Sequence, residues 1–302
     1  MRFENFSSSR FDLSSHSDLL FYVALCSFVG MHSTNYGGCI YSSKYADIHI
    51  LNCLFVMCKS TQNGGCCYIT GANFTNFRSI CASDCYSSSI GMFGMINAAF
   101  EINMELVSVL RCCPNMEGQF QPIYLLGNRF RNHNMNSSLN KPSGDAGFLR
   151  CDTSSIDISQ VTVDRTSSII VLFISGSSGY VRYLNIIHNI EHTRSGYAIV
   201  YCDKVSNWDL LDTVFFGNDY QIAFRIISTL SIHRCFFDDI KGSTQSLSMN
   251  NIQIIKTLTK FEFHHVYTAL CKPEFIYEAS QVIKKQSWSL VLFGMNFVPF
   301  FE

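Results

Sequence analysis

The sequence predicts an all-β protein, a right-handed parallel β-helix of about eleven coils in which each coil takes about 27 residues. Three observations support this prediction. Residues of the same type recur 27 positions apart, an apolar triplet returns along the chain, and short segments alternate apolar with polar residues. A repeat of this length is typical of solenoids, in which each coil buries its apolar side chains against its neighbours.

The 27-residue period is carried by glycine, cysteine and phenylalanine. The residues that recur at this step are Gly37, Gly64, Gly91 and Gly118, then Cys58, Cys85 and Cys112, and also Phe28 and Phe55. Coils of a parallel β-helix stack about 4.8 Å apart, so equivalent residues form columns. We therefore expect the cysteines and phenylalanines to form internal columns. Paired glycines such as Gly37-Gly38 are expected at a corner, where they supply a positive φ or a close approach.

The apolar triplet has the spacing apolar-x-x-apolar-x-apolar and marks successive coils. Clear copies are Val23-Cys26-Phe28, Ile50-Cys53-Phe55, Phe77-Ile80-Ala82, Met104-Val107-Val109, Ile158-Val161-Val163, Leu211-Val214-Phe216, Ile232-Cys235-Phe237 and Trp288-Val291-Phe293, and weaker ones are Leu184-Ile187-Asn189 and Phe263-Val266-Thr268. Between the fourth and fifth copies, the expected triplet positions Arg131, Asn134 and Asn136 are polar. This gap predicts an irregular coil with an excursion at residues 127–146.

A strand-based solenoid explains the sequence better than a helical one. Ile48-His49-Ile50 and Val161-Thr162-Val163 alternate with the period of two that strands require, and no sustained period of 3.6 occurs. Breaks fall at Gly, Ser and Asn, which favour turns. We expect one β-helix domain over residues 21–302, preceded by an N-terminal cap or polar tail at residues 1–20.

Composition excludes several classes of function. The net charge is -1 and the pI about 6.7, so nothing indicates a nucleic-acid partner. The longest apolar run near the start, residues 19–31, is too short to span about 30 Å of hydrocarbon. It also lacks the features of a signal peptide. No motif indicates a cofactor, and the sequence does not predict an oligomeric state.

The 14 cysteines are expected mainly as small core residues. No Cys-x-x-Cys motif is present, and the adjacent pairs Cys66-Cys67 and Cys112-Cys113 should point to opposite faces of a strand. A column of cysteine side chains about 4.8 Å apart permits a disulfide only with strain. Packed thiols are therefore favoured over disulfides, and no metal ligands are expected.

Two tetrapeptides resemble a known repeat. Gly37-Gly38-Cys39-Ile40 and Gly64-Gly65-Cys66-Cys67 look like the Gly-Gly-Ala-Ile repeat of chlamydial polymorphic outer-membrane proteins, which pair it with Phe-x-x-Asn. The second motif occurs at Phe293-Gly294-Met295-Asn296 and, one residue out of phase, at Phe215-Phe216-Gly217-Asn218. Cysteine-rich variants are similar to large surface proteins of trichomonad protists. The resemblance is strongest over residues 20–120. It implies a right-handed β-helix with an adhesive role outside the cell or at its surface, and it transfers no functional residue.

Carbohydrate processing is the main enzymatic alternative, because pectin-lyase-like β-helices include polysaccharide lyases and glycoside hydrolases. Such hydrolases use paired carboxylates, and this chain offers Asn207-Trp208-Asp209 and the pair Asp238 and Asp239. The triplet register places Asp209 and Asp238 at different positions of their coils. The Gly-His-Gly and Arg-x-Lys motifs of those hydrolases are absent. Asp238 and Asp239 are thus weak catalytic candidates, and turn residues after a strand are the simpler interpretation.

The predicted excursion offers the preferred ligand contacts. Arg129, Arg131 and His133 form its most polar part, and loops on a rigid scaffold often carry function. An ordinary solvated loop is the competing interpretation. Sequons at Asn5, Asn73 and Asn136 are compatible with secretion, the last two at expected exposed positions.

These observations favour a non-enzymatic, adhesin-like surface protein that presents ladders of side chains to a glycan or to a host or cell-surface protein. The alternative is a polysaccharide lyase or glycoside hydrolase of the pectin-lyase-like fold. A degenerate family member without activity is a third possibility. Carboxylates clustered on one face of successive coils would favour the enzyme, and the sequence shows no such cluster.

Overall fold

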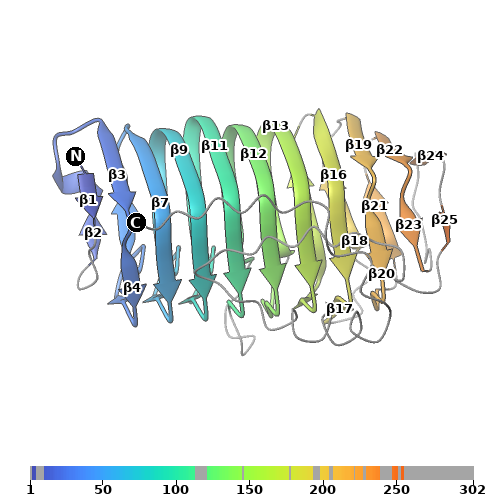
Figure 1. The fold of residues 1–302 in the computed structure, drawn as a ribbon, viewed down its shortest axis with the longest axis horizontal. Coiled ribbons are helices and arrows are strands. Elements are labelled where there is room, and N and C mark those ends of the chain that lie inside the picture. The colour runs from blue at the N-terminus through green and yellow to red at the C-terminus, as the bar shows by residue number, and fades with distance from the viewer. Residues whose placement is uncertain are drawn as a thin grey trace, which may run out of the picture.

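The structure is a parallel β-helix, as predicted. The computed structural model describes residues 2–4, 10–112, 121–144, 146–176, 178–192, 198–203, 207–220, 222–226, 229–238, 247–250 and 253–254. The strand pairings within these residues are all parallel, and the chain forms a solenoid of stacked coils whose number differs slightly from the eleven expected. Figure 1 shows the strands side by side along the long axis, from the N-terminal strands at one end to β24 and β25 at the other.

The strands form three ladders, of which the first two run along the solenoid and the third is interrupted in the described residues. The first ladder stacks β1 (Arg2–Glu4), β3 (Leu20–Ala24), β4 (Ser27–Val29), β7 (Asp47–Val56), β9 (Cys67–Ser83), β11 (Gly94–Leu110), β12 (Ile123–Ser138), β13 (Ala146–Asp164), β16 (Ser178–Ile187), β19 (Asn207–Leu211), β20 (Val214–Phe216), β22 (Thr229–His233), β23 (Phe236–Phe237), β24 (Leu247–Asn250) and β25 (Gln253–Ile254). The second ladder stacks β2 (Phe11–Asp12), β6 (Ile40–Ser42), the first parts of β9, β11, β12 and β13, then β15 (Ile170–Ser175), β18 (Ala198–Asp203) and β21 (Ile222–Ile226). The third consists of β5 (His32–Ser33), β8 (Lys59–Ser60) and β10 (Tyr86–Ser87), with β14 (Ser167–Ser168) and β17 (Ile190–Glu191) further along.

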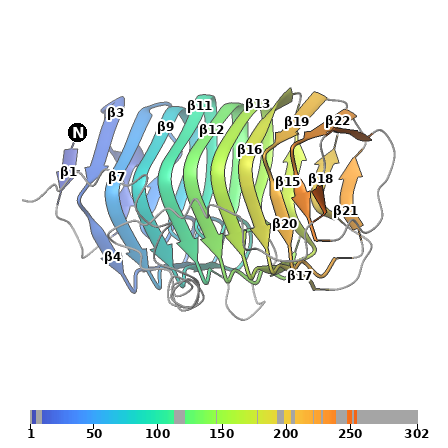
Figure 2. The same ribbon diagram turned by 45° about the vertical axis from the view of Figure 1, so that its right-hand side comes forward.

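Figure 2 shows how the long strands β9, β11, β12 and β13 curve around the rod, so that each contributes to two ladders. The turn between β2 and β3 is a single 3-10 turn, η1 (Leu13–Ser15). Phe11 packs edge-on against Phe28 with ring centroids 5.5 Å apart, and Leu13 is fully buried. Residues 10–13 of the expected cap thus lie against the first turn of the core.

A bend in the backbone explains the spacing of the apolar triplet. In each coil, the residue immediately before the second apolar position adopts a positive φ, and this turns the strand so that the next apolar side chain again faces inward. Residues at this bend are Leu25, Asn52, Ser79, Leu106, Asn134, Gln160, Tyr183, Asp212 and Arg234. Val23, Cys26 and Phe28 therefore all lie in the core, at 0%, 2% and 0% exposure.

The irregular coil predicted at residues 127–146 is wrong for residues 127–138. These residues belong to β12, which pairs with β11 and β13 along its length. Asn132 is aligned with Met104, a step of 28 instead of 27. One extra residue exchanges the inward and outward faces of a strand. The residues that align with the triplet Met104-Val107-Val109 are consequently Asn132, Met135 and Ser137, and not Arg131, Asn134 and Asn136.

The predicted register is also wrong for two later copies of the triplet, by three residues in the first and by one residue in the second. The register aligns Val181 with Ile158, so the copy predicted at Leu184-Ile187-Asn189 is in fact Val181, Leu184 and Ile186. Likewise Leu210 aligns with Val181, which makes the next copy Leu210, Thr213 and Phe215. The predicted copies Phe263-Val266-Thr268 and Trp288-Val291-Phe293 lie outside the described residues.

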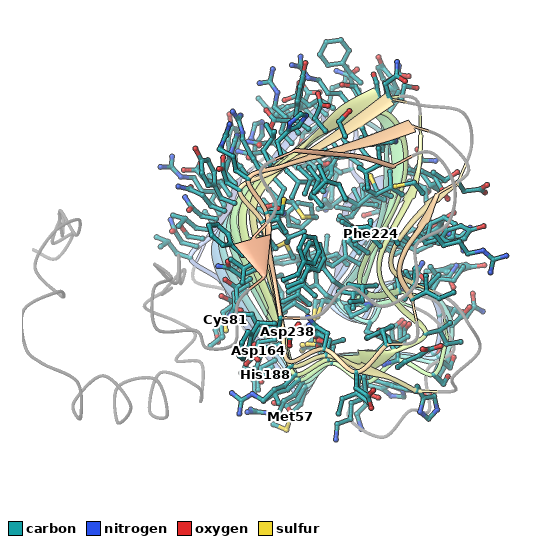
Figure 3. All side chains as sticks on the ribbon, turned by 90° about the vertical axis from the view of Figure 1, so that its right-hand side faces the viewer. Met57, Cys81, Asp164, His188, Phe224 and Asp238 are labelled. Carbon is teal, nitrogen blue, oxygen red and sulfur yellow. The ribbon has the colours of Figure 1, made fainter. Side chains whose placement is uncertain are left out.

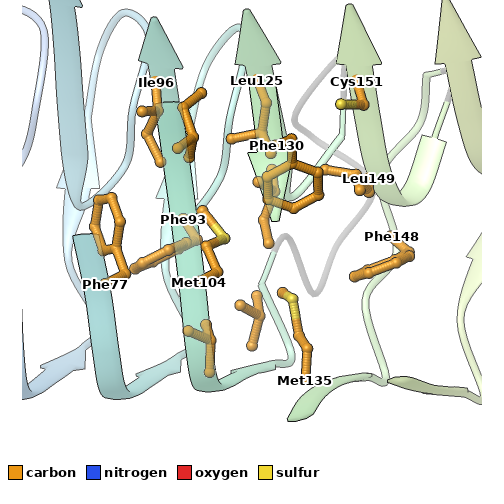
Figure 4. Packing of buried hydrophobic residues seen from close by; sticks show 14 of the residues in the cluster. Phe77, Phe93, Ile96, Met104, Leu125, Phe130, Met135, Phe148, Leu149 and Cys151 are labelled. Atoms are coloured by element: carbon orange, nitrogen blue, oxygen red, sulfur yellow. The ribbon is translucent and has the colours of Figure 1, made fainter. Parts of the chain in front are cut away.

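Aromatic side chains stack inside the solenoid as the period predicts. The rings of Phe28 and Phe55 are 5.0 Å apart and nearly parallel, and those of Phe215 and Phe237 are 4.8 Å apart. Figure 4 shows the middle of the core, where Phe93 and other large side chains fill the space between the ladders. Burial of this apolar surface is the main source of stability, at about 25 cal/mol per Å².

The paired glycines fulfil both expected roles at a corner. Gly37, Gly64 and Gly91 have φ values of +64°, +72° and +71°. At the following position, a Cβ on Gly38 would lie 2.1 Å from the carbonyl oxygen of Gly65. The first glycine thus provides the positive φ and the second allows neighbouring coils to approach. Gly118 lies outside the described residues.

Candidate functional site

A column of aromatic and cationic side chains runs along the second ladder. Strand register places one residue of each successive coil in this column, which we call the tyrosine stripe. Its members are Tyr41, Tyr68, Met95, Tyr124, Arg150, Phe173, Tyr201 and Arg225. Most of these side chains are half-buried, while Arg225 is exposed and Phe173 is 9% exposed. The stripe therefore presents ring faces and edges at the surface of the rod.

The rings of the stripe stack on one another where aromatic residues are adjacent. Tyr41 and Tyr68 are 5.8 Å apart and nearly parallel, and the loop residue Tyr36 stacks on Tyr68 at 4.5 Å. Further along, Phe173 and Tyr201 stack at 5.0 Å. Cross-strand aromatic pairs of this kind stabilise a sheet by up to about 1 kcal/mol each. The stacking also fixes the rings in place along the ladder.

Two arginines of the stripe lie beside its rings. The guanidinium of Arg150 lies 5.4 Å from the centre of the Tyr124 ring and 4.6 Å from that of Phe173. Arg225 lies 5.8 Å from the centre of Tyr201 in the same way. These are cation–π distances. The stripe thus combines apolar ring surface with the hydrogen-bond donors of two arginines.

Asp152 supplies a carboxylate beside the stripe. Its Oδ2 accepts a hydrogen bond from the Tyr124 hydroxyl at 2.9 Å and lies 3.5 Å from Nε of Arg150. Burial and the negative charge of Asp152 raise the pKa of Tyr124 to about 12. Tyr124 therefore remains a neutral hydrogen-bond donor throughout the physiological range.

A second carboxylate stands in the same column as Asp152. Cys151 aligns with Ile174, and Ile174 with Cys202, so Asp152 and Asp203 follow equivalent positions two coils apart. Two steps of about 4.8 Å separate their backbones by about 10 Å. Carboxyl groups of inverting glycosidases are about 6.5–9.5 Å apart, a separation that side chains on backbones about 10 Å apart can reach. The sequence alone did not reveal this pair.

Arg129, Arg131 and His133 lie in a strand and not in the predicted loop. They occupy alternate positions of β12 and share one outward face of the first ladder. Both arginines approach Glu101 on β11, at 3.9 Å and 3.7 Å, and the ring of His133 is hydrogen-bonded to Ser159. The structure thus places the three residues on one face of the ladder. There Glu101 of the neighbouring coil compensates the charges of the two arginines.

The carboxylate candidates from the sequence do not form a site in the described residues. Asp238 follows β23 at a corner and accepts a hydrogen bond from the backbone N–H of Gly217, which is the role of a turn residue. Figure 3 shows Asp238 at the same corner of the cross-section as Asp164 and His188. Asp209 lies in a different column, aligned with Tyr180. Asp239 lies outside the described residues.

The sequon residues are less accessible than expected. Asn136 is 2% exposed inside β12. The Asn73 side chain donates to Asp47 at 2.8 Å and accepts from the Tyr45 hydroxyl at 3.0 Å. Neither amide therefore presents itself as a free acceptor for glycosylation, and the expectation of exposure is wrong for Asn136.

A column of cysteines and asparagines lines the corner beyond the triplet. Its members, one in each successive coil, are Met31, Cys58, Cys85, Cys112, Asn140, Thr166, Asn189 and Asn218. The Asn189 amide donates to the carbonyl oxygen of Val163 in the preceding coil, and the Asn218 amide to that of Ile186. Phe215-Phe216-Gly217-Asn218, the motif that seemed out of phase, is therefore in register.

Three thiols from two repeats meet inside this corner. Cys58 and Cys85 come from the column just described, and Cys66 follows the Gly64-Gly65 pair. Their sulfur atoms all lie within 4.8 Å of one another, and each residue is fully buried. Hydrogen bonds from the thiols of Cys39, Cys66 and Cys85 hold the pKa of Cys58 below its usual range. Burial raises the pKa of Cys66 and of Cys85 well above theirs.

The structure adds two findings about the cysteines. Cys66 and Cys67 are both fully buried at the glycine corner. The described cysteines are mostly free, as expected, but Cys81 is disulfide-bonded. The thiol cluster was missed because Cys58 and Cys66 look unrelated in sequence. Only the closure of a coil brings the two repeat motifs together.

Comparison with known proteins adds no assignment. No family model, no curated protein and no solved structure matches this chain. Within the described residues, the structure contains no helix that is long and apolar enough to cross a membrane.

Proposed function

We propose that the protein is a non-enzymatic, adhesin-like β-helix of the cell surface that binds a glycan chain along the tyrosine stripe. The observation that carries this proposal is the unbroken column from Tyr41 to Arg225, one residue wide and aligned with the long axis of the solenoid. A line of this shape fits a linear ligand better than the broad patch of a protein–protein interface. Aromatic faces offer apolar contact, and arginine and aspartate offer hydrogen bonds to hydroxyl groups.

The stripe is preferred to the Arg129, Arg131 and His133 face as the contact surface. The two arginines lie within 4 Å of Glu101, so much of their charge is compensated within the protein. Tyrosine and arginine are also the residue types that most often dominate binding energies at interfaces. If the stripe instead contacts a protein, the chain should be retained on no polysaccharide in the experiment that follows.

The test is retention of the purified chain on a panel of neutral and acidic polysaccharides, scored together with the release of new chain ends. Replacing Tyr68 and Tyr124 by Ala should weaken retention on the order of 30-fold, if each ring contributes about 1 kcal/mol. Tyr180→Ala is the matched control, because Tyr180 is an exposed tyrosine on the first ladder. Equal retention of both variants, or retention on no polysaccharide, would refute binding at the stripe.

An enzyme that cleaves the same ligand is the second candidate, favoured by Asp152 and Asp203 beside the stripe. Release of new chain ends that is abolished by Asp152→Asn and by Asp203→Asn would establish this alternative. It would also exclude the non-enzymatic role. Retention without new ends supports the adhesin-like function.

A further inference from the structure

The thiols of Cys58, Cys66 and Cys85 have the arrangement of a metal site. Their sulfur atoms lie within 4.8 Å of one another, so a small movement would bring all three into contact with one ion. The residues are fully buried and free of disulfides. The sequence carries no familiar metal motif here, because the ligands come from two different repeats of neighbouring coils.

The backbone around the cluster orients the sulfur atoms toward one another. Sγ of Cys58 lies 3.4 Å from the carbonyl oxygen of Phe28 and 3.4 Å from that of Val56. Sγ of Cys85 lies 3.6 Å from the carbonyl oxygen of Phe55 and 3.3 Å from that of Ser83. Each cysteine therefore occupies a fixed position in the wall, with neighbouring coils holding its Cα in register. Such preorganisation favours metal binding, because little side-chain entropy remains to be lost.

The ligand set selects a soft cation. Thiolates prefer Cu(I), Zn(II) and iron–sulfur clusters over Ca²⁺ or Mg²⁺, which require oxygen ligands. Structural Zn(II) sites are almost always tetrahedral with four protein ligands. Cys39 is also buried nearby, but it does not belong to the group whose sulfur atoms are all mutually close. The geometry thus offers three ligands, a number that suits Cu(I).

We propose that Cys58, Cys66 and Cys85 bind one Cu(I) ion through their three sulfur atoms. Binding releases protons from the thiols that become ligands and involves no change in the oxidation state of sulfur or copper. Because the site is buried, the ion enters as the chain folds or during local opening of the corner. This site is independent of the tyrosine stripe, which lies on the outside of the second ladder.

The test uses the full chain, reduced and kept free of oxygen, titrated with Cu(I) in competition with a chromogenic Cu(I) chelator. The expected result is one Cu(I) per chain and a copper X-ray absorption spectrum that reports three sulfur neighbours. Cys66→Ala should weaken the affinity on the order of a hundredfold or more. Cys151→Ala is the matched control, because Cys151 is an equally buried cysteine whose described partner is Thr153.

Two further measurements test the number and identity of the ligands. Cys39→Ala should leave Cu(I) binding unchanged, and the spectrum of the unsubstituted chain gives the sulfur count even if a variant fails to fold. A parallel titration with Zn(II) tests the four-ligand alternative. The proposal is overturned by failure to compete with the chelator, by equal losses in Cys66→Ala and Cys151→Ala, or by tighter Zn(II) binding that requires Cys39.

Discussion

Cys85 and Asn189 occupy the same column of the solenoid and donate a hydrogen bond to the equivalent backbone carbonyl of the preceding coil. The Cys85 thiol lies 3.6 Å from the oxygen of Phe55, and the Asn189 amide lies 3.1 Å from that of Val163. Within a strand, a backbone N–H of the next coil would donate to this carbonyl. At the corner, the side chain supplies the donor instead. The thiol is the weaker donor. Beside Cys85, the sulfur atom of Cys66 from the Gly-Gly-Cys corner lies within 4.8 Å.

Asn189 should therefore contribute more to stability than the cysteines of its column. Its Oδ1 also accepts from the backbone N–H of Thr166 at 2.9 Å, a contact that a thiol cannot replace well. Asn189→Ala leaves a buried donor and a buried acceptor unpaired, and we expect a loss of about 2–5 kcal/mol in the free energy of unfolding. Asn189→Cys should lose less, because the donor to Val163 remains. Urea unfolding measures both variants, and equal losses would contradict the shared role of the two residue types.

Alanine substitution at Gly38 and at Gly30 should destabilise the fold for different reasons. A Cβ on Gly38 would lie 2.1 Å from a backbone oxygen, whereas a Cβ on Gly30 would meet nothing within 4 Å. Gly30→Ala should cost only about 1–2 kcal/mol, the strain of its φ of +65°. Gly38→Ala should cost clearly more, about 3 kcal/mol or above, because two coils must move apart. The midpoints of urea unfolding compare the two variants, and a milder effect at Gly38 would show that the coils do not approach closely there.

The fold was predictable where the coils keep one length. Between Val23 and Val109 the triplet repeats at 27 residues, so the period alone identified the inward residues. The step from Met104 to Asn132 is 28, and a single added residue exchanged the two faces of β12 in the prediction. Sequence periodicity cannot detect such a change when the side chains concerned are polar, as they are in that coil.

The tyrosine stripe escaped prediction for the same reason. Tyr41, Tyr68 and Met95 follow the period, but Tyr124 comes 29 residues after Met95, and Phe173 only 23 after Arg150. Only strand register shows that these residues share a column. Asp152 and Asp203 are likewise brought into one column by coils of unequal length.

Substitution of Asp238 and Asp239 by Asn should leave ligand binding intact. In the structure, Asp238 accepts a hydrogen bond from the backbone of Gly217, and an asparagine side chain retains an acceptor oxygen for this contact. Retention of the double variant on the polysaccharide that binds the unsubstituted chain measures the effect. Loss of retention with an unchanged circular dichroism spectrum would reassign the contact surface to this corner.

The ion pair between Asp84 and Arg111 should make stability depend on pH below about 4. The two side chains form a bidentate contact, with Nε–Oδ1 at 3.0 Å and Nη2–Oδ2 at 3.1 Å. Burial tends to raise the pKa of Asp84, but hydrogen bonds from Arg111 and Ser83 outweigh it, so the pKa lies below its ordinary value of 3.8. A lowered pKa in the folded state adds stability above the unfolded pKa, and this contribution disappears as the pH falls through the folded value.

The comparison with Arg111→Met isolates this contribution. Without the guanidinium, the pKa of Asp84 should rise, so the variant should lose less stability than the unsubstituted chain between pH 5 and pH 2. Between pH 5 and pH 8 the carboxylate stays ionised in both states, and the difference in unfolding free energy between the two chains should be constant. Thermal melts across this range test the prediction. Parallel curves down to pH 2 would mean that the pair contributes nothing through the ionisation of Asp84.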